Sequence, residues 1–434
     1  MSNSLILRNI HSLIGIEEGD VLLKKGAGMA ETGILNNAWL LIIDGKIKSF
    51  GLEPYNIADF SEKEDQTISD RKFVNSLQVI DCAGKMVFPS FCDSHTHLVY
   101  AGSREIEYID KIKGLSYEEI AKRGGGILNS AKRLHETSEE LLTKDALGRL
   151  DEVISYGTGA IEIKSGYGLN TNDELKMLRV IKALKSLSEL SIKATFLGAH
   201  AVPAKYKGRQ ADYVDLIVKE MIPRVAEEKL ADYIDVFCDK GFFNPDETSR
   251  MLEAGIACGL RPKIHANELD YSGGIQTGVK HNALSVDHLE YTGDAEIEVL
   301  LNSNTMPTLL PGAAFFLNMV HAPARKMINA GLPIALASDF NPGSSPSGNM
   351  QLVLSMGCIM FRMLPVEALN ACTINGAYAM NLSDKLGSIT VGKIANLSIS
   401  KQIPGIEYMP YYYGSNKLDT IILNGKIIKS GIPA

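Results

Sequence analysis

Apolar residues recur along this chain with two different spacings. Up to about residue 85 they form short runs, such as Ser4 to Ile10, without the three- and four-residue spacing of an amphipathic helix. Another run, Ala38 to Ile47, is interrupted by Asp44-Gly45, which is a strong signal for a β-hairpin. The polar stretch 61–70 indicates an exposed loop. We therefore predict a small unit of β-strands at the start of the chain.

From Met86 onward, short apolar runs alternate with longer segments that have helical spacing. In the segments 173–187 and 210–227, for example, apolar residues recur at i, i+3 and i+4. The predicted strands lie near 86–93, 158–164, 192–199, 233–238, 262–267, 284–289, 305–310 and 334–339. Eight repeats of strand and helix predict a closed (β/α)₈ barrel. A doubly wound open sheet is the alternative, but no GxGxxG motif follows an early strand.

After about Leu386 the short-strand pattern returns, and it includes a second hairpin signal at Asn424-Gly425. These strands are too few to be stable alone. We expect them to join the N-terminal strands in one small β-sandwich. The fold class is therefore predicted as α/β, a TIM-like barrel over 86–386 inserted between sandwich segments 1–85 and 387–434.

Composition and charge narrow the classes of protein. A net charge of −7, with no block of Lys and Arg, argues against a nucleic-acid-binding surface. No stretch of about 18 apolar residues suggests a membrane span, and the first residues lack the features of a signal peptide. The six cysteines show no CxxC spacing and are read as free thiols, several of them buried. A reducing cytoplasmic location is therefore expected.

Histidines gather at the predicted carboxyl ends of barrel strands. His95 and His97 follow strand 1, and residues two apart on an extended backbone point to the same side. His200, His265 and His288 end strands 3, 5 and 6. Catalytic residues of barrel enzymes lie at this rim. One histidine alone would more simply be a structural residue, but five on one rim indicate a shared site.

The donors His95, His97, His265 and Asp339, the last at the end of strand 8, would give a metal three nitrogens and one oxygen. This set leaves an open position for water and suits one Zn²⁺ or Fe²⁺/Fe³⁺ ion. Strand 4, over 233–238, contains no lysine that could be carboxylated to bridge a second metal. A bound metal would lower the pKa of its water from about 15.7 toward 7, which predicts a hydrolase that uses a metal-bound hydroxide.

Two further residues are candidates for catalysis. Glu268 lies three residues beyond His265 and could carry a proton from the water to a leaving nitrogen, a role that Asp339 could share. His288 faces the same mouth and could hydrogen-bond the hydroxide or the developing oxyanion. Lys164, at the end of strand 2, is interpreted as a structural or charge-balancing residue.

The whole pattern resembles the amidohydrolase superfamily and, within it, the imidazolonepropionase family. The motifs that carry the resemblance are His95-Thr96-His97, Ser165-Gly166-Tyr167-Gly168 and Asp339-Phe340-Asn341-Pro342-Gly343-Ser344-Ser345. The resemblance implies a homodimeric enzyme of histidine degradation. Its reaction is the hydrolytic ring opening of 4-imidazolone-5-propanoate to N-formimidoyl-L-glutamate.

The implied substrate carries a carboxylate, and Arg104, seven residues after His97, can form a bidentate pair with it. The resemblance also assigns substrate contacts to Tyr117, Tyr167, His200, Glu268, Asn341, Gly343 and Ser344. A nucleobase-type deaminase of the same superfamily is the alternative. Such an enzyme would use a similar metal set but would not need Arg104.

Overall fold

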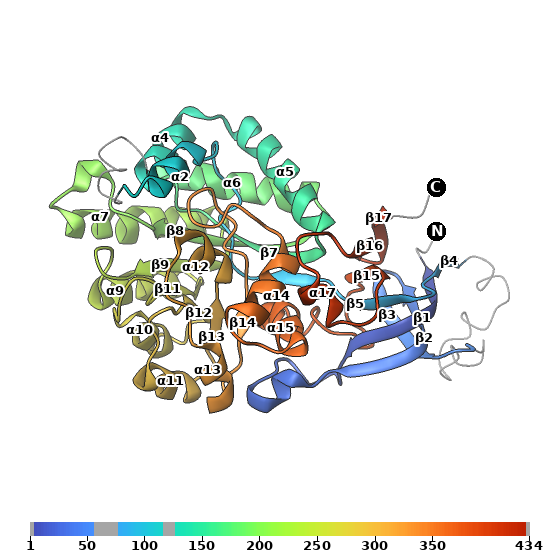
Figure 1. Cartoon of the computed structure of the whole chain (residues 1–434). Coiled ribbons are helices and arrows are strands. Elements are labelled where there is room, and N and C mark those ends of the chain that lie inside the picture. The colour runs from blue at the N-terminus through green and yellow to red at the C-terminus, as the bar shows by residue number, and fades with distance from the viewer. Residues whose placement is uncertain (1–3, 56–76, 116–125, 431–434) are drawn as a thin grey trace.

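The computed structural model describes residues 4–55, 77–115 and 126–430. They form a barrel surrounded by helices and, beside it, a separate mixed sheet (Figure 1). The loop expected at 61–70 and the candidate Tyr117 lie outside the described residues. The predicted fold class is confirmed, because strands from both ends of the chain build the small sheet and the intervening residues build the barrel.

Eight parallel strands form the barrel: β6 (Phe91–Asp93), β7 (Thr158–Lys164), β8 (Ser191–Ala199), β9 (Tyr233–Cys238), β11 (Ile264–Ala266), β12 (Ser285–His288), β13 (Met306–Leu309) and β14 (Ala335–Leu336). They are neighbours in sequence order, with the short β10 (Arg261–Pro262) beside β9. The barrel closes just beyond β6 and β14, where Thr96 and Phe340 form a parallel bridge. There the Asp339 N–H donates to the His95 carbonyl at 3.0 Å. Closure therefore places two predicted metal ligands side by side.

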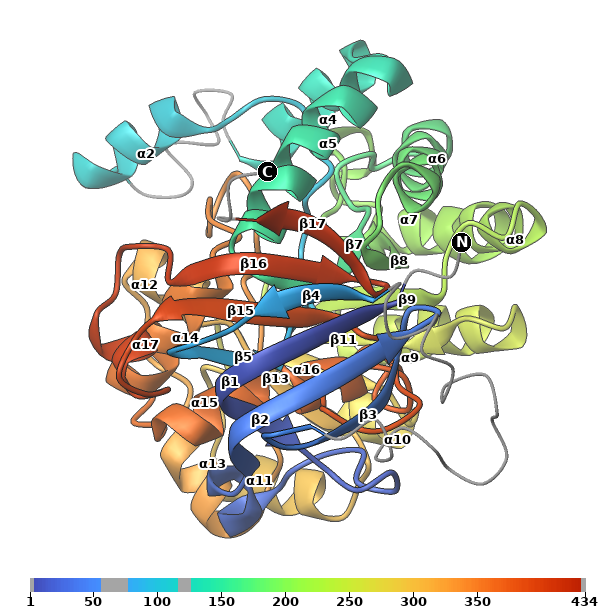
Figure 2. The ribbon, with the colours of Figure 1, turned by 90° about the vertical axis from the view of Figure 1, so that its right-hand side faces the viewer.

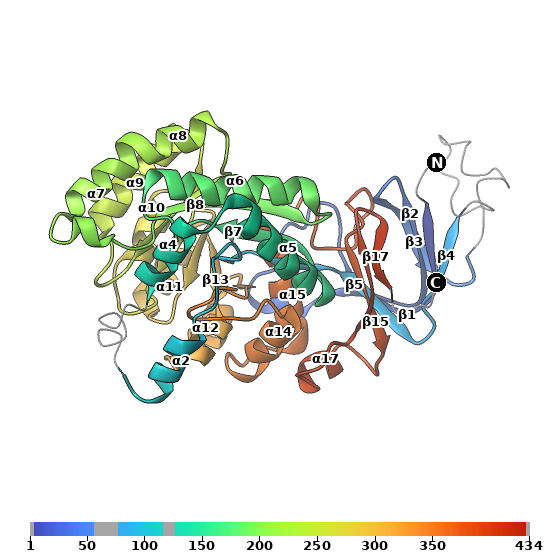
Figure 3. The same cartoon turned by 90° about the horizontal axis from the view of Figure 1, so that it is seen from above.

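Helices cover the outside of the barrel (Figure 3). They are α2 (Glu105–Ile112), α4 (Ile127–Glu136), α5 (Glu139–Ser155), α6 (Thr171–Leu187), α7 (Gln210–Leu216), α8 (Ile222–Glu227), α9 (Pro245–Ala257), α10 (Gly274–Lys280), α11 (Asp294–Leu301), α12 (Pro311–Leu317), α13 (Ala324–Ala330), α14 (Met350–Ile359), α15 (Pro365–Cys372), α16 (Ile374–Tyr378) and α17 (Tyr408–Tyr411), with short 3₁₀ turns η1 (Gly26–Ala30) and η3 (Ala204–Tyr206). Among the residues described, no helix is both long and apolar enough to cross a membrane.

Local sequence explains where α6 begins and why another predicted helix contains a π-helical turn. The Asn170 side chain accepts from the backbone of Asp173 at the start of α6, which confirms the helix predicted over 173–187. The helix predicted over 210–227 is interrupted by a π-helical turn, η4 (Ile217–Met221). Pro223, just after this turn, has no N–H to continue a regular α-helical hydrogen-bond ladder.

The mixed sheet joins the two ends of the chain (Figure 2). Its strands are β1 (Leu5–Ile16), β2 (Gly33–Ile43), β3 (Lys46–Leu52), β4 (Gln78–Asp81), β5 (Lys85–Pro89), β15 (Leu397–Gln402), β16 (Leu418–Leu423) and β17 (Lys426–Ser430), in the order β17-β16-β15-β5-β1-β2-β3 with β4 also beside β1. Both predicted hairpins are confirmed. Asp44-Gly45 and Asn424-Gly425 have positive φ at all four residues, as the favoured two-residue turn requires.

One predicted strand, 86–93, is wrong as a single element. Residues up to Pro89 belong to β5, which pairs with β1 and β15 in the mixed sheet, whereas β6 starts at Phe91 and pairs with β7 in the barrel. The chain changes sheets at Ser90, whose N–H donates to the Asn396 carbonyl at 3.0 Å. The run looks like one strand in the sequence because all of residues 86–93 are buried and most of them are apolar.

Candidate active site

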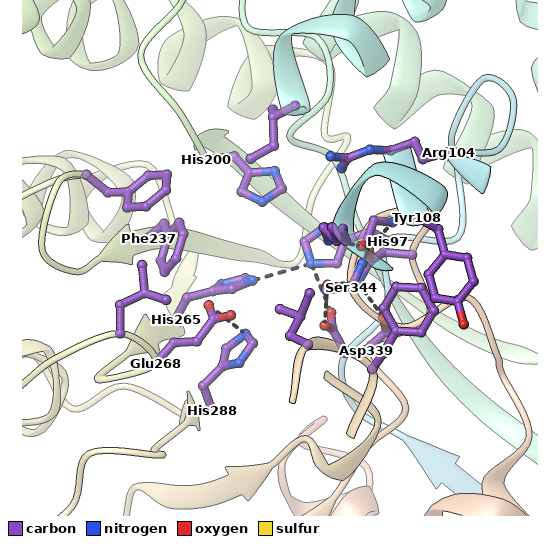
Figure 4. Close-up of a pocket in the computed structure, with 18 of the residues that line it drawn as sticks. His97, Arg104, Tyr108, His200, Phe237, His265, Glu268, His288, Asp339 and Ser344 are labelled. Atoms are coloured by element: carbon purple, nitrogen blue, oxygen red, sulfur yellow. Dashed lines mark hydrogen bonds and ion pairs between the residues drawn. The ribbon is translucent and has the colours of Figure 1, made fainter. Parts of the chain in front are cut away.

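The structure brings the predicted metal ligands to one end of the barrel. Donor atoms of His95, His97 and Asp339 all lie within 4.8 Å of one another, and so do those of His95, His265 and His288. Both His95 Nε2 and His97 Nε2 lie 3.6 Å from Asp339 Oδ1. His265 Nε2 lies 3.3 Å from His97 Nε2 (Figure 4). Strand ends that are far apart in sequence thus supply one compact group of nitrogen and oxygen donors.

These residues fit a metal ion by their chemistry as well as by their positions. His95 Nε2 is buried and has no hydrogen-bond partner among the described residues. Burial holds the pKa values of His95 and His97 well below their usual range, and neighbouring cations and imidazoles lower them further. The rings are therefore neutral at pH 7 and can offer a lone pair to Zn²⁺ or iron without first losing a proton.

Carboxylates behind the ligands orient two of the imidazole rings. His95 Nδ1 shares a 2.6 Å hydrogen bond with Asp287 Oδ2. His265 Nδ1 lies 2.9 Å from Asp235 Oδ2. A carboxylate at Nδ1 fixes the ring orientation and leaves Nε2 to face the site.

Two buried lysines connect these carboxylates beneath the site. Lys164 Nζ donates to Glu162 Oε1 at 2.6 Å and to Asp235 Oδ2 at 2.8 Å, and lies 3.7 Å from Asp287 Oδ2. Lys263 Nζ donates to the other oxygen of Glu162. Burial alone would lower the pKa of Lys164, but the surrounding carboxylates outweigh it and raise that pKa. The interpretation of Lys164 as a charge-balancing residue agrees with these contacts.

Four charged residues of this network were not predicted from the sequence: Glu162, Lys263, Asp235 and Asp287. A signal for them was present, because each is a charged residue within or beside a predicted buried strand. Successive residues of a strand face opposite sides, so residues two apart share a side, and Glu162 and Lys164 both face the barrel interior.

Glu268 and His288 face each other across the mouth of the site. His288 Nε2 lies 3.7 Å from Glu268 Oε2 (Figure 4). Asp239 holds the backbone beneath Glu268 by accepting from its N–H at 2.7 Å. Burial, with the nearby negative charges of Asp339 and Asp239, raises the pKa of Glu268 to about 8. A carboxyl group that changes protonation near neutral pH is suited to proton transfer.

Three site residues hold a backbone conformation that L-amino acids rarely adopt. The φ angles are +85° at His288, +70° at Leu289 and +53° at Asp339. Such conformations cost on the order of 1–3 kcal/mol each and cluster at functional sites. The Leu289 N–H donates to the Ala266 carbonyl at 3.2 Å, which ties the end of β12 to β11.

The Ser-Gly-Tyr-Gly loop is held by a buried carboxylate that the sequence analysis missed. Glu174 accepts hydrogen bonds from the N–H groups of Gly166 at 3.0 Å and Leu169 at 2.9 Å. The Gly166 carbonyl lies 3.1 Å from His200 Nδ1. This loop therefore places both Tyr167 and His200 at the cavity.

The loop after β14 is organised by Asn341. Its Nδ2 donates to the Asp339 carbonyl and to Ser344 Oγ, each at 2.7 Å, and its Oδ1 accepts from the N–H groups of Gly343 and Ser344. Ser344 Oγ in turn donates to Asp339 Oδ2 at 3.2 Å. Both ends of the Asn341 amide are thus engaged in shaping the loop that carries Asp339.

A cavity of about 720 Å³ opens over these residues, and Arg104 lines it together with His265 and Glu268. Arg104 Nε and Nη2 donate to Glu107 Oε2 at 2.8 and 2.5 Å. The other edge of the guanidinium, at Nη1, has no partner in the described part of the chain. Glu107 therefore fixes Arg104 and leaves one donor edge for a ligand.

Comparisons with known proteins agree with this arrangement. A model of the amidohydrolase family matches residues 86–428. Curated relatives that match nearly the whole chain carry the name imidazolonepropionase. The protein from Christiangramia forsetii is 52% identical and covers 98% of this chain and 100% of its own length. The protein from Flavobacterium johnsoniae is 51% identical over 98% of this chain and 99% of its own length. The protein from Alkaliphilus oremlandii is 39% identical over 99% of this chain and 98% of its own length.

Solved structures with the same fold are more distant in sequence. A triazine hydrolase variant superposes with a TM-score of 0.73 at 14% identity, over 99% of this chain and 95% of its own. A guanine deaminase from C. acetobutylicum with guanine bound in its active site superposes with a TM-score of 0.67 at 15% identity, over 98% of this chain and all of its own. At these identities the likeness concerns the fold.

Proposed function

The chain belongs to the amidohydrolase family and catalyses the imidazolonepropionase reaction, and from this premise we propose which of its residues perform each step. The reaction is hydrolytic: water adds to the ring carbonyl carbon of 4-imidazolone-5-propanoate, and the bond from that carbon to the ring nitrogen breaks. The deaminase alternative is not supported, because a deaminase shares only the fold at 15% identity whereas full-length relatives at 50–52% identity are imidazolonepropionases.

We assign the metal to His95, His97, His265 and Asp339, with one Zn²⁺ or Fe²⁺/Fe³⁺ ion per subunit. A bound ion of this kind lowers the pKa of water and so supplies a nucleophile at neutral pH. The unpartnered nitrogen of His95 and the short distances among the four residues support the assignment.

Glu268 accepts the proton of the attacking water and delivers it to the leaving ring nitrogen. Its raised pKa and its position across from His288 support this role. His288 donates a hydrogen bond to the carbonyl oxygen as negative charge develops there. Asp339, held by Ser344, is available as a second proton acceptor.

Arg104 binds the propionate carboxylate through the donor edge that Glu107 leaves free. Tyr167 and His200, placed by the same loop, contact the ring, and Asn341, Gly343 and Ser344 shape the loop opposite. The observation that carries the proposal is that one cavity is lined by three of the candidate metal ligands, His97, His265 and Asp339, and by a cation with a free donor edge. Tyr117 remains a predicted substrate contact.

A Glu268→Gln variant tests the proton-transfer role. It should keep its metal content and lose about 10²–10⁴-fold in turnover of 4-imidazolone-5-propanoate, the usual contribution of general acid–base catalysis. Asp270→Asn is the matched control, because Asp270 lies two residues away and pairs with the exposed Lys240 at 2.7 Å. Turnover by Glu268→Gln within a few-fold of the parent, at equal metal content by elemental analysis, would refute the assignment.

We further propose a cytoplasmic homodimer. All six cysteines are free and four of them are buried, which is typical of a reducing compartment. The dimer is implied by the family resemblance, and sedimentation equilibrium of the purified protein tests it.

A further inference from the structure

Lys111, on α2, is a cation at the cavity for which neither the sequence nor the comparisons give a role. It lines the same cavity as Arg104. Its Nζ donates to the Gly343 carbonyl at 3.1 Å, and the side chain is partly buried. Within residues 4–55, 77–115 and 126–430 it forms no ion pair. An ammonium group removed from water without a carboxylate partner is costly, so its position calls for an anionic ligand.

Lys111 and Arg104 converge on Gly343. A Cβ atom at Gly343 would meet Arg104 Nη1, so the guanidinium packs directly against this glycine and would have to shift if it were replaced. Burial lowers the pKa of Lys111, and the charge of Arg104 lowers it further, which indicates that the two cations are close. Glu107 balances only one of them, because it pairs with Arg104 and not with Lys111. The charge of Glu107 still raises the pKa of Lys111, but less than burial and Arg104 lower it, so within the described residues Lys111 lacks an ion-pair partner of its own.

Two aromatic side chains lie beside this partly buried charge. Tyr108 stacks on Phe316 with ring centroids 5.1 Å apart, and Lys111 Nζ lies 5.8 Å from the centroid of the Phe316 ring. Both aromatic residues line the cavity. A charge interaction is stronger in such surroundings than at an open surface.

We propose that Lys111 is a second carboxylate-binding residue, which holds the acid tail of the substrate together with the free edge of Arg104. This deepens the proposed function and rests on it. The two cations make the enzyme select ring substrates that carry a carboxylate tail, while the Gly343 carbonyl keeps the Lys111 side chain in place until the substrate binds.

The test compares Lys111→Met, Lys111→Arg and a control, Lys113→Met, which removes the same charge from an exposed residue just after α2. Two probes of nearly equal shape are titrated by calorimetry: imidazole-4-propanoate and its neutral amide. Lys111→Met should bind the carboxylate at least tenfold more weakly and the amide within twofold of the parent. Lys111→Arg should recover most of the loss, and Lys113→Met should match the parent for both probes.

Steady-state kinetics with 4-imidazolone-5-propanoate add a second measure. Lys111→Met should raise KM about tenfold and change kcat by less than threefold. If both probes lose affinity equally, Lys111 only braces the Gly343 loop and the proposal is overturned, as it is if neither loses affinity. If the parent enzyme does not turn over 4-imidazolone-5-propanoate, the proposed function fails, but the difference between the two probes still decides the role of Lys111.

Discussion

Replacing Lys164 by Met tests the buried charge network beneath the site. The substitution keeps most of the side-chain volume and removes the ammonium that contacts Glu162 at 2.6 Å and Asp235 at 2.8 Å. Two lysines there balance three carboxylates, all fully buried, so the variant leaves one lysine against three. Removal of one partner from a buried ion pair typically costs about 3–5 kcal/mol, because the remaining charge is left uncompensated.

The matched control is Lys240→Met, because Lys240 pairs with Asp270 at 2.7 Å but is 76% exposed. Exposed pairs contribute about 0–1 kcal/mol. Urea unfolding of the metal-free protein measures the free energy of unfolding of both variants. In thermal unfolding, an entropy of about 2.1 cal/mol/K per residue over 434 residues means that a loss of about 3–5 kcal/mol lowers Tm by about 3–5 °C.

Equal losses of unfolding free energy in Lys164→Met and Lys240→Met would refute the reasoning, since the two pairs differ mainly in burial. A second arm separates charge from packing. Adding Asp235→Asn to Lys164→Met removes the carboxylate that lost its partner. The double variant should therefore be less destabilised than the sum of the two single variants predicts.

Two further predictions concern the loops and the metal ligands. Gly166→Ala should lower both kcat/KM and the free energy of unfolding, because Gly166 has φ +114° and a Cβ there would lie 2.8 Å from His200 Nδ1. The control is Gly208→Ala, which has φ +75° and open space around it and should cost only the backbone strain of about 1–2 kcal/mol. Equal activity of the two variants would contradict this reasoning. Burial raises the pKa of Asp339 to about 7 in the metal-free protein, so Zn²⁺ affinity should rise about tenfold per pH unit below 7 and level off above it. Calorimetry at several pH values in two buffers measures both the affinity and the proton released, and an affinity that is flat from pH 5.5 to 7 would exclude Asp339 as a ligand.

Local sequence fixed several features without help from the rest of the chain. Asp44-Gly45 requires a tight turn with positive φ, and the structure has it. Asn170 begins a helix because its side chain can accept from a free backbone N–H. The eight strand–helix repeats and the histidines at strand ends follow from spacing alone, because alternate residues of a strand share a side.

Other features depend on contacts between segments far apart in the chain. The run 86–93 is apolar on both faces whether it forms one strand or two, so only pairing with β15 and β7 divides it at Ser90. Only packing determines that Lys111, on α2, lines the cavity and approaches Gly343.

The sequence by itself thus determined most of the helices and strands and the kinds of side chain that end the barrel strands, because turn chemistry, helix capping and strand alternation act over a few residues. The tertiary structure decided which donors meet. Barrel closure between His95 and Asp339 brings the predicted ligands into one group. The burial of Lys164 beside Asp235 and Asp287 makes the stability of each charge depend on the others. Both effects arise from the register of distant strands and from the exclusion of water, which no local pattern encodes.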